Sequence, residues 1–320
     1  MSKIARFFLI SCVFIILGGI FFIRFSTKGK QFPVHEGVRL ILSKFNTINH
    51  IIHEGRVYKE NHKGFPSSTS FIWDYFKLQL KTHLISSNRE VEGEFLEFKI
   101  HGPNFGIISF LVGEIFFKRE YYFYSNKINP FIIDCGSNIG VSVLFFKLLY
   151  PNSKILAFEP DKKAFELLKR NVTDNNLSSV FLENKALSNK KGFLNFSSSA
   201  SIDKVGVTMR LVDSGSNKNI IKVPAVTLSD YISEEVDLLK MDIEGAETSV
   251  IEELSQNNKL RNIKKMIIEY HHHIKEDEDS MSSILSLLEK NGFGYGIEGT
   301  LSRLPSNGKY QDIMIYAYRK

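Results

Sequence analysis

The chain has 320 residues, of which 43% are hydrophobic and 24% are charged, and its formal net charge is +6. This composition predicts a packed core, with room for one large α/β domain and an accessory region. The charge excess is modest and no dense basic run is interleaved with aromatic residues, so no nucleic-acid partner is expected. The two cysteines, Cys12 and Cys135, lie in dissimilar segments and have no zinc-site spacing.

The first 30 residues predict a transmembrane anchor. Phe7 to Ile23 is an uncharged apolar run of 17 residues between Arg6 and Arg24, and as a helix it would cover about 25 Å, the short end of what spans a bilayer. A secretory signal peptide is the alternative. The residues from Ile20 to Phe25 are bulky, however, where a cleavage site needs small side chains. We therefore expect an uncleaved, single-pass anchor.

Flanking charges suggest the orientation of this anchor. Lys3 and Arg6 precede the apolar run, whereas Arg24, Lys28 and Lys30 follow it. Because positive charge is enriched on the cytoplasmic side of a span, the small excess after the run places the rest of the chain in the cytoplasm.

Residues 31–125 are expected to form a small α+β accessory region. Apolar residues at helical spacing and runs of β-favouring residues alternate there without a catalytic motif. The expected elements are an amphipathic helix over 38–52, a helix opening at Trp73, strands over 94–100 and 106–112 around a turn at 101–104, and a helix over 114–123.

From Phe131 onward, apolar strands alternate with amphipathic helices, which predicts a doubly wound, mostly parallel α/β sheet in a domain over 126–320. Residues 192–196 and 220–226 are expected to form an inserted hairpin around a polar loop over 213–219. The expected strands are 131–134, 154–159, 180–184, 236–242, 263–270, 293–298 and 312–318, with helices over 141–150, 161–175, 246–255 and 279–290.

The domain is organised around residues 131–140, FIIDCGSNIG. A buried strand ends at Asp134, Gly136 and Gly140 permit a tight loop, and the next helix points its N-terminus at the loop. This is also compatible with an ordinary tight connection. Glu159 ends the second strand, where a carboxylate can accept hydrogen bonds from ribose hydroxyls, although it also suits the N-terminus of the following helix.

The glycine spacing and the charge of Asp134 indicate which nucleoside cofactor the loop binds. A dinucleotide site would need a middle glycine that the run lacks, and Asp134 beside the loop repels a pyrophosphate but attracts an ammonium group. The residues therefore favour S-adenosylmethionine over NAD.

Polar residues at the strand ends form a second candidate site. Ligands bind outside the carboxyl ends of such strands, and the residues expected on that rim are Asp134, Glu159, Asn184, Asp242 and Glu269. A close group of charged residues follows at the fourth strand: Lys240, Asp242, Glu244 and Glu247. If this group is only the solvated N-terminus of the next helix, Glu247 is explained, because acids there offset the helix dipole. That interpretation does not explain Asp242, which follows a buried run and needs a partner: Lys240, a bound cation or a substrate hydroxyl. Of the three consecutive histidines at 271–273, His271 could act as a general base.

Six segments in this order resemble the FkbM family of class I S-adenosylmethionine-dependent methyltransferases. They are residues 132–140, 157–160, 184–188, 223–228, 239–247 and 267–270. The resemblance covers about two thirds of the chain, and the Lys240–Glu247 run is its most specific part. Cys135-Gly-Ser is a mild departure from the family's pattern.

The resemblance implies a Rossmann-like fold with a reversed last strand and a cofactor site. The implied cofactor-binding residues are Asp134, Gly136, Ser137, Asn138, Gly140, Glu159, Asn184 and Ala186, the last two flanking the adenine. It also brings the segment of Glu120 and Tyr121 close to the cofactor, although core packing would equally explain the aromatic residues there.

We therefore interpret the chain as a membrane-anchored O-methyltransferase with Asp242, Glu244 and His271 as catalytic candidates. By resemblance, the acceptor is a hydroxyl of a small molecule, sugar, glycan or glycolipid. No metal ion is expected, because a third and a fourth oxygen ligand are not evident. The alternatives are an NAD-dependent Rossmann oxidoreductase and a methyltransferase-like interaction module that has lost activity.

Overall fold

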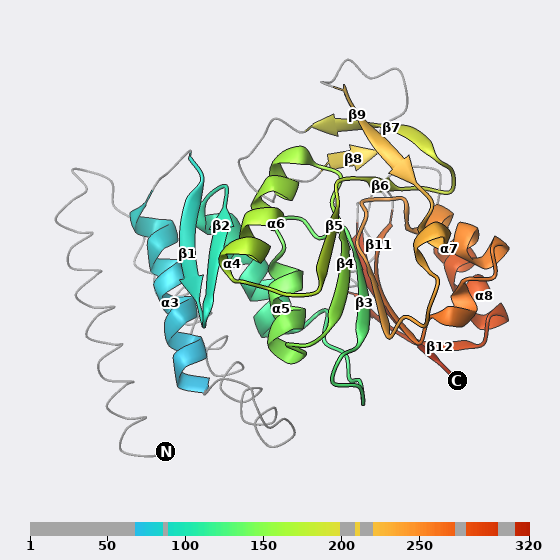
Figure 1. Ribbon diagram of the computed structural model, residues 1–320, viewed down its shortest axis with the longest axis horizontal. Helices are drawn as coiled ribbons and strands as arrows, with labels where there is room; N and C mark the ends of the chain where they lie inside the picture. Colours follow the sequence, from blue (N-terminus) through green and yellow to red (C-terminus); the bar gives the residue numbers. More distant parts are fainter. Residues whose placement is uncertain (1–67, 86–88, 199–208, 212–219, 273–279, 300–310) are drawn as a thin grey trace, which may run out of the picture. The chain divides into compact units, whose positions relative to one another are not determined.

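The computed structural model describes residues 68–85, 89–198, 209–211, 220–272, 280–299 and 311–320. The expected anchor over 1–30 and the expected helix over 38–52 lie outside these ranges. Among the described helices, none combines the length and hydrophobicity that a bilayer crossing requires. One compact unit, Lys59–Lys320, contains the elements of the accessory region and those of the α/β domain (Figure 1). The boundaries proposed at residues 30 and 125 stay predictions.

The centre of this unit is a seven-stranded sheet with the order β12-β13-β11-β10-β3-β4-β5. All neighbouring strands from β11 to β5 run parallel, and β13 runs antiparallel to both β11 and β12. The doubly wound, mostly parallel sheet and its reversed last strand are thus confirmed. The strands are β3 (Phe131–Cys135), β4 (Lys154–Phe158), β5 (Val180–Glu183), β10 (Leu238–Met241), β11 (Lys265–His272), β12 (Phe293–Gly299) and β13 (Gln311–Arg319).

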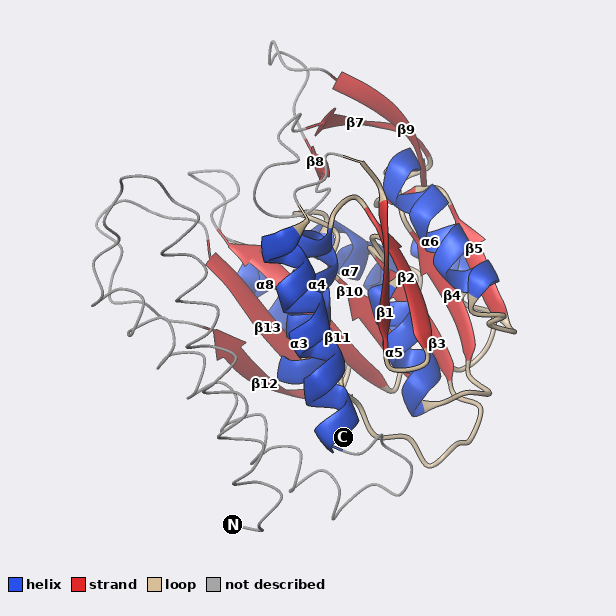
Figure 2. Cartoon of the chain, turned by 90° about the vertical axis from the view of Figure 1, so that its left-hand side faces the viewer, coloured by secondary structure: helices blue, strands red, loops and turns tan. Residues whose placement is uncertain are grey.

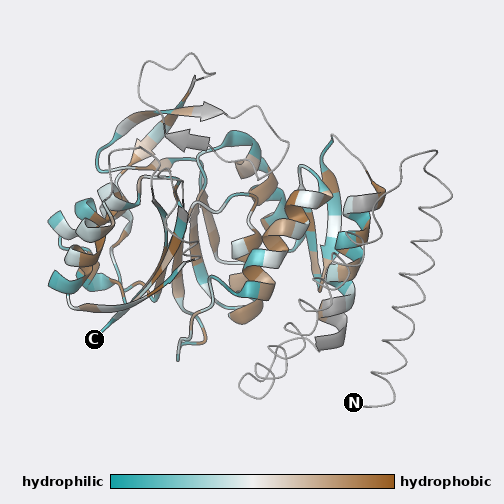
Figure 3. Cartoon of the chain, turned by 180° about the vertical axis from the view of Figure 1, so that it is seen from behind, coloured by the Kyte–Doolittle hydropathy of each residue, from teal (hydrophilic) through white to brown (hydrophobic). Residues whose placement is uncertain are grey.

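Helices cover both faces of this sheet, as Figures 1 and 2 show. Successive residues of a strand point to opposite faces, so Ile132 belongs to the hydrophobic cluster with α5 and α6, and Ile133 to the cluster with α7 and α8. Figure 3 shows the hydrophobic colouring of the central strands. The helices are α5 (Val141–Leu149), α6 (Lys162–Asp174), α7 (Glu247–Gln256) and α8 (Met281–Lys290), with 3-10 turns η2 (Leu228–Tyr231) and η3 (Leu260–Asn262).

The inserted hairpin is confirmed and is part of a larger element. A separate four-stranded sheet has the order β6-β9-β7-β8, in which β7 and β9 pair antiparallel with Leu194 opposite Val223. Its strands are β6 (Ala186–Leu187), β7 (Gly192–Ser198), β8 (Met209–Leu211) and β9 (Ile220–Val226). The expected loop over 213–219 lies outside the described ranges.

In the accessory region, the predicted strands are wrong in two respects. Residues 94–100 do not form one strand. They contribute to a hairpin of β1 (Val91–Phe95) and β2 (Phe98–Gly102), which turns at Leu96 with a φ of 53°. The second predicted strand is the helix α4 (Phe105–Val112). Asn104 caps it, because its Oδ1 accepts a hydrogen bond from the backbone N of Ile107 at 2.9 Å. The apolar run is buried by tertiary packing, and this overrides its preference for a strand.

The remaining accessory helices differ from the prediction mainly in their bounds. The helix at Trp73 is confirmed as α3 (Ser68–Leu84). The helix expected over 114–123 is the shorter π-helix η1 (Gly113–Lys118), and the chain leaves it at Arg119 with a φ of 58°. This left-handed residue turns the chain so that the following segment runs towards the central sheet.

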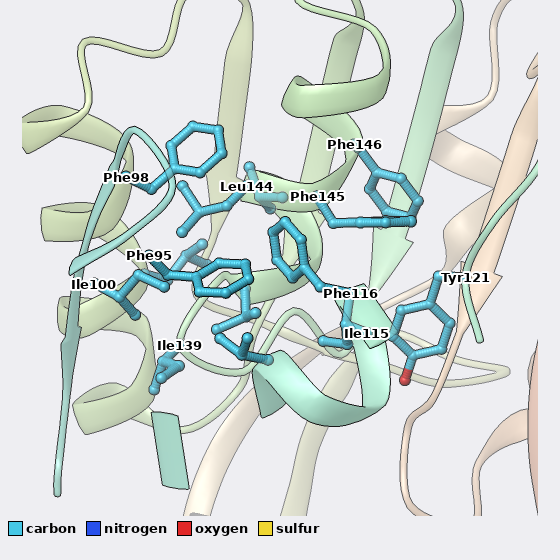
Figure 4. Packing of buried hydrophobic residues seen from close by; sticks show 14 of the residues in the cluster. Phe95, Phe98, Ile100, Ile115, Phe116, Tyr121, Ile139, Leu144, Phe145 and Phe146 are labelled. Carbon is cyan, nitrogen blue, oxygen red and sulfur yellow. The ribbon is translucent and has the colours of Figure 1, made fainter. Parts of the chain in front are cut away.

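Aromatic packing fixes the accessory elements to the sheet's α5–α6 side (Figure 4). Phe116 of η1 is fully buried, and its ring meets Phe95 of β1 edge-on at 5.1 Å and Phe145 of α5 at 5.2 Å. A T-shaped arrangement is favourable for such rings. Phe116 therefore links the hairpin to the central domain, and Tyr121 follows five residues later on the way to the strand ends.

Candidate active site

The glycine loop lies directly against the end of β10. Gly136 has a φ of 82°, and a Cβ at this position would come within 1.7 Å of the backbone oxygen of Asp242. Gly140 has a φ of 88° and begins α5, where a Cβ would meet Leu168 at 2.5 Å. Only glycine permits both the conformation and the close approach. The two motifs found in the sequence thus form one site.

A pocket opens between this loop and the ends of β4 and β10. It encloses about 640 Å³, counting space open to solvent, and it is lined by Gly136, Asn138, Phe158, Glu159, Pro160, Lys185, Ala186, Leu187, Phe196, Asp242, Ile243, Glu244 and Ala246. Six of the residues proposed from the sequence are among them: Gly136, Asn138, Glu159, Ala186, Asp242 and Glu244. The small sheet contributes Phe196 of β7, which no sequence signal indicated.

Other residues proposed from the sequence lie behind the pocket wall. Asp134 is fully buried, and its Oδ2 accepts a hydrogen bond from the hydroxyl of Ser142 at 2.6 Å. Ser137 donates its hydroxyl to the backbone oxygen of Asp134. Asn184 donates to the backbone oxygens of Glu159 and Pro160. Asp134 and Ser137 therefore shape the glycine loop, and Asn184 holds the backbone at the end of β4.

Glu159 connects the loop to the second strand. One carboxylate oxygen accepts a hydrogen bond from the backbone N of Asn138 at 2.8 Å, and the other from that of Asp161 at 2.7 Å. Burial raises the pKa of this carboxyl to about 8. Each oxygen has further lone pairs, so hydroxyl groups of a ribose in the pocket could donate to it.

The pocket suits a cationic nucleoside better than a phosphorylated one. Among its described lining residues, Lys185 is the only basic one, and it is paired with Glu183 at 2.7 Å. Glu159, Asp242 and Glu244 are acidic. A pyrophosphate would be repelled here, whereas the ammonium and sulfonium groups of S-adenosylmethionine would be attracted.

Lys240 lies beneath the loop as a buried cation. Its Nζ donates to the backbone oxygen of Gly136 at 2.7 Å, and it lies 3.3 Å from Oδ1 of Asp134 and 3.6 Å from Oδ2 of Asp242. Burial alone lowers the pKa of Lys240, but Asp134, Asp242 and Glu269 outweigh it and raise the pKa above its ordinary value. Lys240 is thus one of the partners expected for Asp242, and it joins the glycine loop to the acids that follow β10.

A tyrosine joins two of the acids. The hydroxyl of Tyr121 lies 3.3 Å from Oδ2 of Asp242 and 3.2 Å from Oε2 of Glu269, and Figure 4 shows its ring beside the aromatic cluster. Burial and the two carboxylates raise the pKa of Tyr121 well above its ordinary value, so the phenol remains a donor. Burial, with Asp242 adding to it, raises the pKa of Glu269 to about 8.

His271 completes the group at the end of β11. Its Nδ1 lies 2.8 Å from Oε1 of Glu247, and its Nε2 lies 3.7 Å from both Asp242 and Glu244. Burial lowers the pKa of this imidazole, but Glu247, Asp242 and Glu244 outweigh it and raise the pKa to about 10. The imidazole is therefore a cation near neutral pH and cannot accept a proton there, which changes the role expected of it from base to counter-charge.

Glu247 differs from its interpretation as a solvated acid. It is in the first turn of α7, as expected, but only 1% of its surface is exposed. Its Oε1 also accepts hydrogen bonds from the backbone N atoms of Ile243 and Gly245. The residue is a buried support for both the connection after β10 and the ring of His271.

Three of these side chains could hold a metal ion. Within the described ranges, one ligand atom each of Asp242, Glu269 and His271 lie within 4.8 Å of one another. The sequence alone did not show a third ligand, and the fold supplies one by bringing Glu269 and His271 to Asp242. A metal would have to displace the proton of His271.

The sequence did not assign a catalytic role to three residues of this group: Tyr121, Lys240 and Glu269. The strand-end rule already placed Glu269 on the rim, and Lys240 is two residues from Asp242 on the same face of β10. The position of Tyr121 depends on the turn after η1, which no local pattern indicated.

Comparison with known proteins gives consistent matches. A family model described as the methyltransferase FkbM domain matches residues 134–295, just over half of the chain. Methyltransferase 1 of Beauveria bassiana is 29% identical over 60% of this chain and 83% of its own length. The 31-O-demethyl-FK506 methyltransferase FkbM of Streptomyces tacrolimicus is 26% identical over 59% of this chain and 83% of its own.

A solved structure, methyltransferase FkbM of Methylobacillus flagellatus KT, is 19% identical and has a TM-score of 0.40. The match covers 61% of this chain and 45% of that one. This likeness is too weak to carry an argument about the site.

Removal of the Glu159 carboxylate should weaken cofactor binding. We expect Glu159→Ala to reduce the affinity for S-adenosylmethionine by about 1.5–3 kcal/mol, the range for hydrogen bonds to a charged group. The measurement is calorimetry at a pH above 8, where the Glu159 carboxyl, with its pKa of about 8, is ionised. Asp161→Ala is the matched control, because this carboxylate caps α6 through the backbone N of Ala164 and does not line the pocket. The control should lose stability but keep its affinity. Equal affinity in all three proteins would contradict a ribose contact.

The charge of His271 should make stability depend on pH. Its pKa is raised from 6.5 to about 10, so its contribution is complete below pH 6.5 and is lost as the pH rises through 10. Compared with His271→Gln, the wild type should be more stable by on the order of a few kcal/mol at pH 6, and this difference should vanish near pH 10. Denaturant unfolding across this range measures it. Glu120 and Glu269 have pKa values of about 8 in the wild type, and because both proteins contain them, the comparison is made above pH 8. Parallel stability curves for the two proteins from pH 8 to 10 would contradict an imidazolium.

Proposed function

The chain belongs to the FkbM methyltransferase family, and we propose that it methylates a hydroxyl group of a sugar, glycan or glycolipid-like acceptor at a membrane. Methyl transfer with S-adenosylmethionine as cofactor follows from the family. The hydroxyl acceptor is supported by the name of the Streptomyces tacrolimicus relative, which describes a 31-O-demethyl compound. The single observation that carries the proposal is the direct contact between the cofactor loop at Gly136 and the acidic strand end at Asp242.

S-adenosylmethionine supplies an activated methyl group when bound, so the protein's task is to position the acceptor and to remove its proton. Asp242 is suited to this, because it lines the pocket and its side chain is 26% exposed. Gly136, Asn138 and Glu159 line the pocket and would hold the cofactor, which would supply a methyl group to the acceptor oxygen and keep the electron pair of its carbon–sulfur bond on sulfur. The hydroxyl proton moves to the Asp242 carboxylate.

The neighbours of Asp242 prepare it for this role. Lys240 and His271 lie 3.6 and 3.7 Å from its two oxygens and hold the carboxylate in one orientation. Tyr121 holds Oδ2 through its hydroxyl. Glu244 lines the same pocket and is positioned to accept a hydrogen bond from a second hydroxyl of a polyol acceptor. His271 acts here as a positioning residue through its charge.

The family match favours S-adenosylmethionine over NAD, and the acidic lining agrees with it. An inactive interaction module remains the alternative that only an assay separates from an enzyme. Transfer of labelled methyl groups to sugars, glycans and glycolipids from cell extracts tests both the activity and the acceptor class, with RNA as the comparison substrate. Binding of cofactor without transfer to any of them would support the inactive module, and transfer to RNA alone would refute the acceptor class.

Neutralising the strand-end acids should slow transfer more than it weakens cofactor binding. Asp242→Asn and Glu244→Gln keep size and most hydrogen bonds, and each should lower turnover by roughly 10²–10⁴, the usual value of acid–base catalysis. Glu234→Gln, at a surface carboxylate that is 54% exposed, is the control and should be unchanged. We expect chelators to have no effect; activity that is lost with a chelator and restored by Mg²⁺ or Mn²⁺ would instead assign a metal to Asp242, Glu269 and His271.

The apolar run before residue 30 should hold the protein in a membrane with the catalytic unit in the cytoplasm, where S-adenosylmethionine is made. The full chain should resist extraction by alkaline carbonate, and protease added to intact cells should leave the catalytic unit whole. A soluble protein trimmed near Phe25 would show that the run is a signal peptide. Digestion of the unit from outside would reverse the orientation.

A further inference from the structure

The helix α3 carries an apolar stripe on its outward side. Trp73, Leu80 and Leu84 are 45%, 45% and 72% exposed. With Lys77 they occupy positions that recur every three or four residues, so they lie on one face of the helix. Ile85, at the end of the helix, is also exposed. Single exposed apolar residues are ordinary, but three on one helix face, a tryptophan among them, mark an interaction surface.

The opposite face of α3 already has its partners. Phe71 and Leu78 are buried, and the ring of Phe71 packs against Phe95 at 5.3 Å and Phe117 at 4.4 Å. Tyr75 packs on Phe117 at 4.2 Å. The packing of α3 on the accessory core therefore does not use the stripe. A helix with apolar residues on both faces needs a second apolar environment.

Side chains bordering the stripe suit a lipid surface. Trp73 stacks on Phe76 with ring centroids 5.7 Å apart, and its indole N–H can remain in the polar layer while its ring enters the apolar one. Lys77 is 47% exposed and pairs with Asp74, whereas Lys81 lies over the ring of Phe105, 5.2 Å from its centroid. Long basic side chains can extend to headgroup phosphates while their stems cover apolar surface.

We propose that the outward stripe of α3 rests in the interface of the bilayer that holds the N-terminal anchor. The proposal rests on the anchoring proposed above. In the sequence, α3 is the first described helix after the apolar run, which ends at Ile23. Tethering raises the local concentration of the bilayer around the helix, so an interfacial contact that is weak alone becomes populated. The catalytic unit is then held at the surface where a glycolipid acceptor resides.

The chain contains its own probe for this contact. Trp73 is the only tryptophan among the 320 residues, so the tryptophan emission of the full chain reports on α3 alone. We would reconstitute the full chain in vesicles of phosphatidylcholine with a minority of phosphatidylglycerol. An interfacial helix buries its apolar face about 5–10 Å into the boundary, so lipids brominated near the headgroup end of their chains should quench Trp73 about twofold, and lipids brominated near the chain ends less.

Substitutions separate this contact from other causes of quenching. Leu84→Asp, alone and with Leu80→Asp, should abolish the quenching. Ile128→Asp changes an equally exposed apolar residue, 77% exposed in a loop outside α3, and should leave it intact. Binding of S-adenosylmethionine by each variant in detergent checks that the catalytic unit is folded.

Each outcome decides between occupants of the stripe. Blue-shifted emission that bromine does not quench would mean that protein covers the stripe, either an N-terminal segment of this chain or a second copy, and would overturn the proposal. Red-shifted emission open to aqueous quenchers would overturn it too. Extraction by carbonate is measured separately on the same vesicles: release of the protein refutes the anchor, whereas an unquenched Trp73 in a retained protein refutes only the contact of α3.

Discussion

The site depends on the contact between the backbone at Gly136 and the backbone at Asp242. The parallel register of β3 and β10 places Lys240 beside Asp134 and Met241 beside Cys135, and the backbone N of Asp242 donates to the oxygen of Cys135 at 3.0 Å. The ladder thus continues to the point where both strands leave the sheet. Because Gly136 has no side chain, the loop turns directly over Asp242. The cofactor loop and the acid proposed as proton acceptor are therefore positioned by one interaction.

Around this contact, buried charges are arranged so that each has a counter-charge. Lys240 faces Asp134 and Asp242, and His271 faces Glu247, Asp242 and Glu244. Glu269, which Tyr121 contacts, has a pKa raised to about 8 instead. Buried ion pairs contribute little net stability, because desolvation offsets their attraction. Their fixed geometry next to a pocket is better explained by chemistry, since charges that are already oriented do not reorganise during a reaction.

The accessory region has a role in the site as well as in packing. Phe116 ties η1 to both the hairpin and α5, and the left-handed turn at Arg119 then directs Tyr121 to the strand ends. The same region presents the stripe of α3 on its other side. Its elements thus connect the surface that we assign to the membrane with the acids that we assign to catalysis.

Local sequence determined much of this protein by itself. The period of the apolar residues predicted the alternating strands and helices after Phe131, and the strand-end rule predicted that Asp134, Glu159 and Asp242 would gather on one rim. These predictions hold because a parallel sheet buried on both faces needs continuous apolar strands, and because its ligands bind where those strands end.

Only the tertiary structure decided the rest. The run from Phe105 to Val112 is apolar in either conformation, and it is a helix because Asn104 caps it and the hairpin packs on it. The charge of His271 and the donor role of Tyr121 depend on neighbours more than twenty residues away in the chain. Burial and these distant carboxylates set their pKa values, and no local pattern encodes such distances.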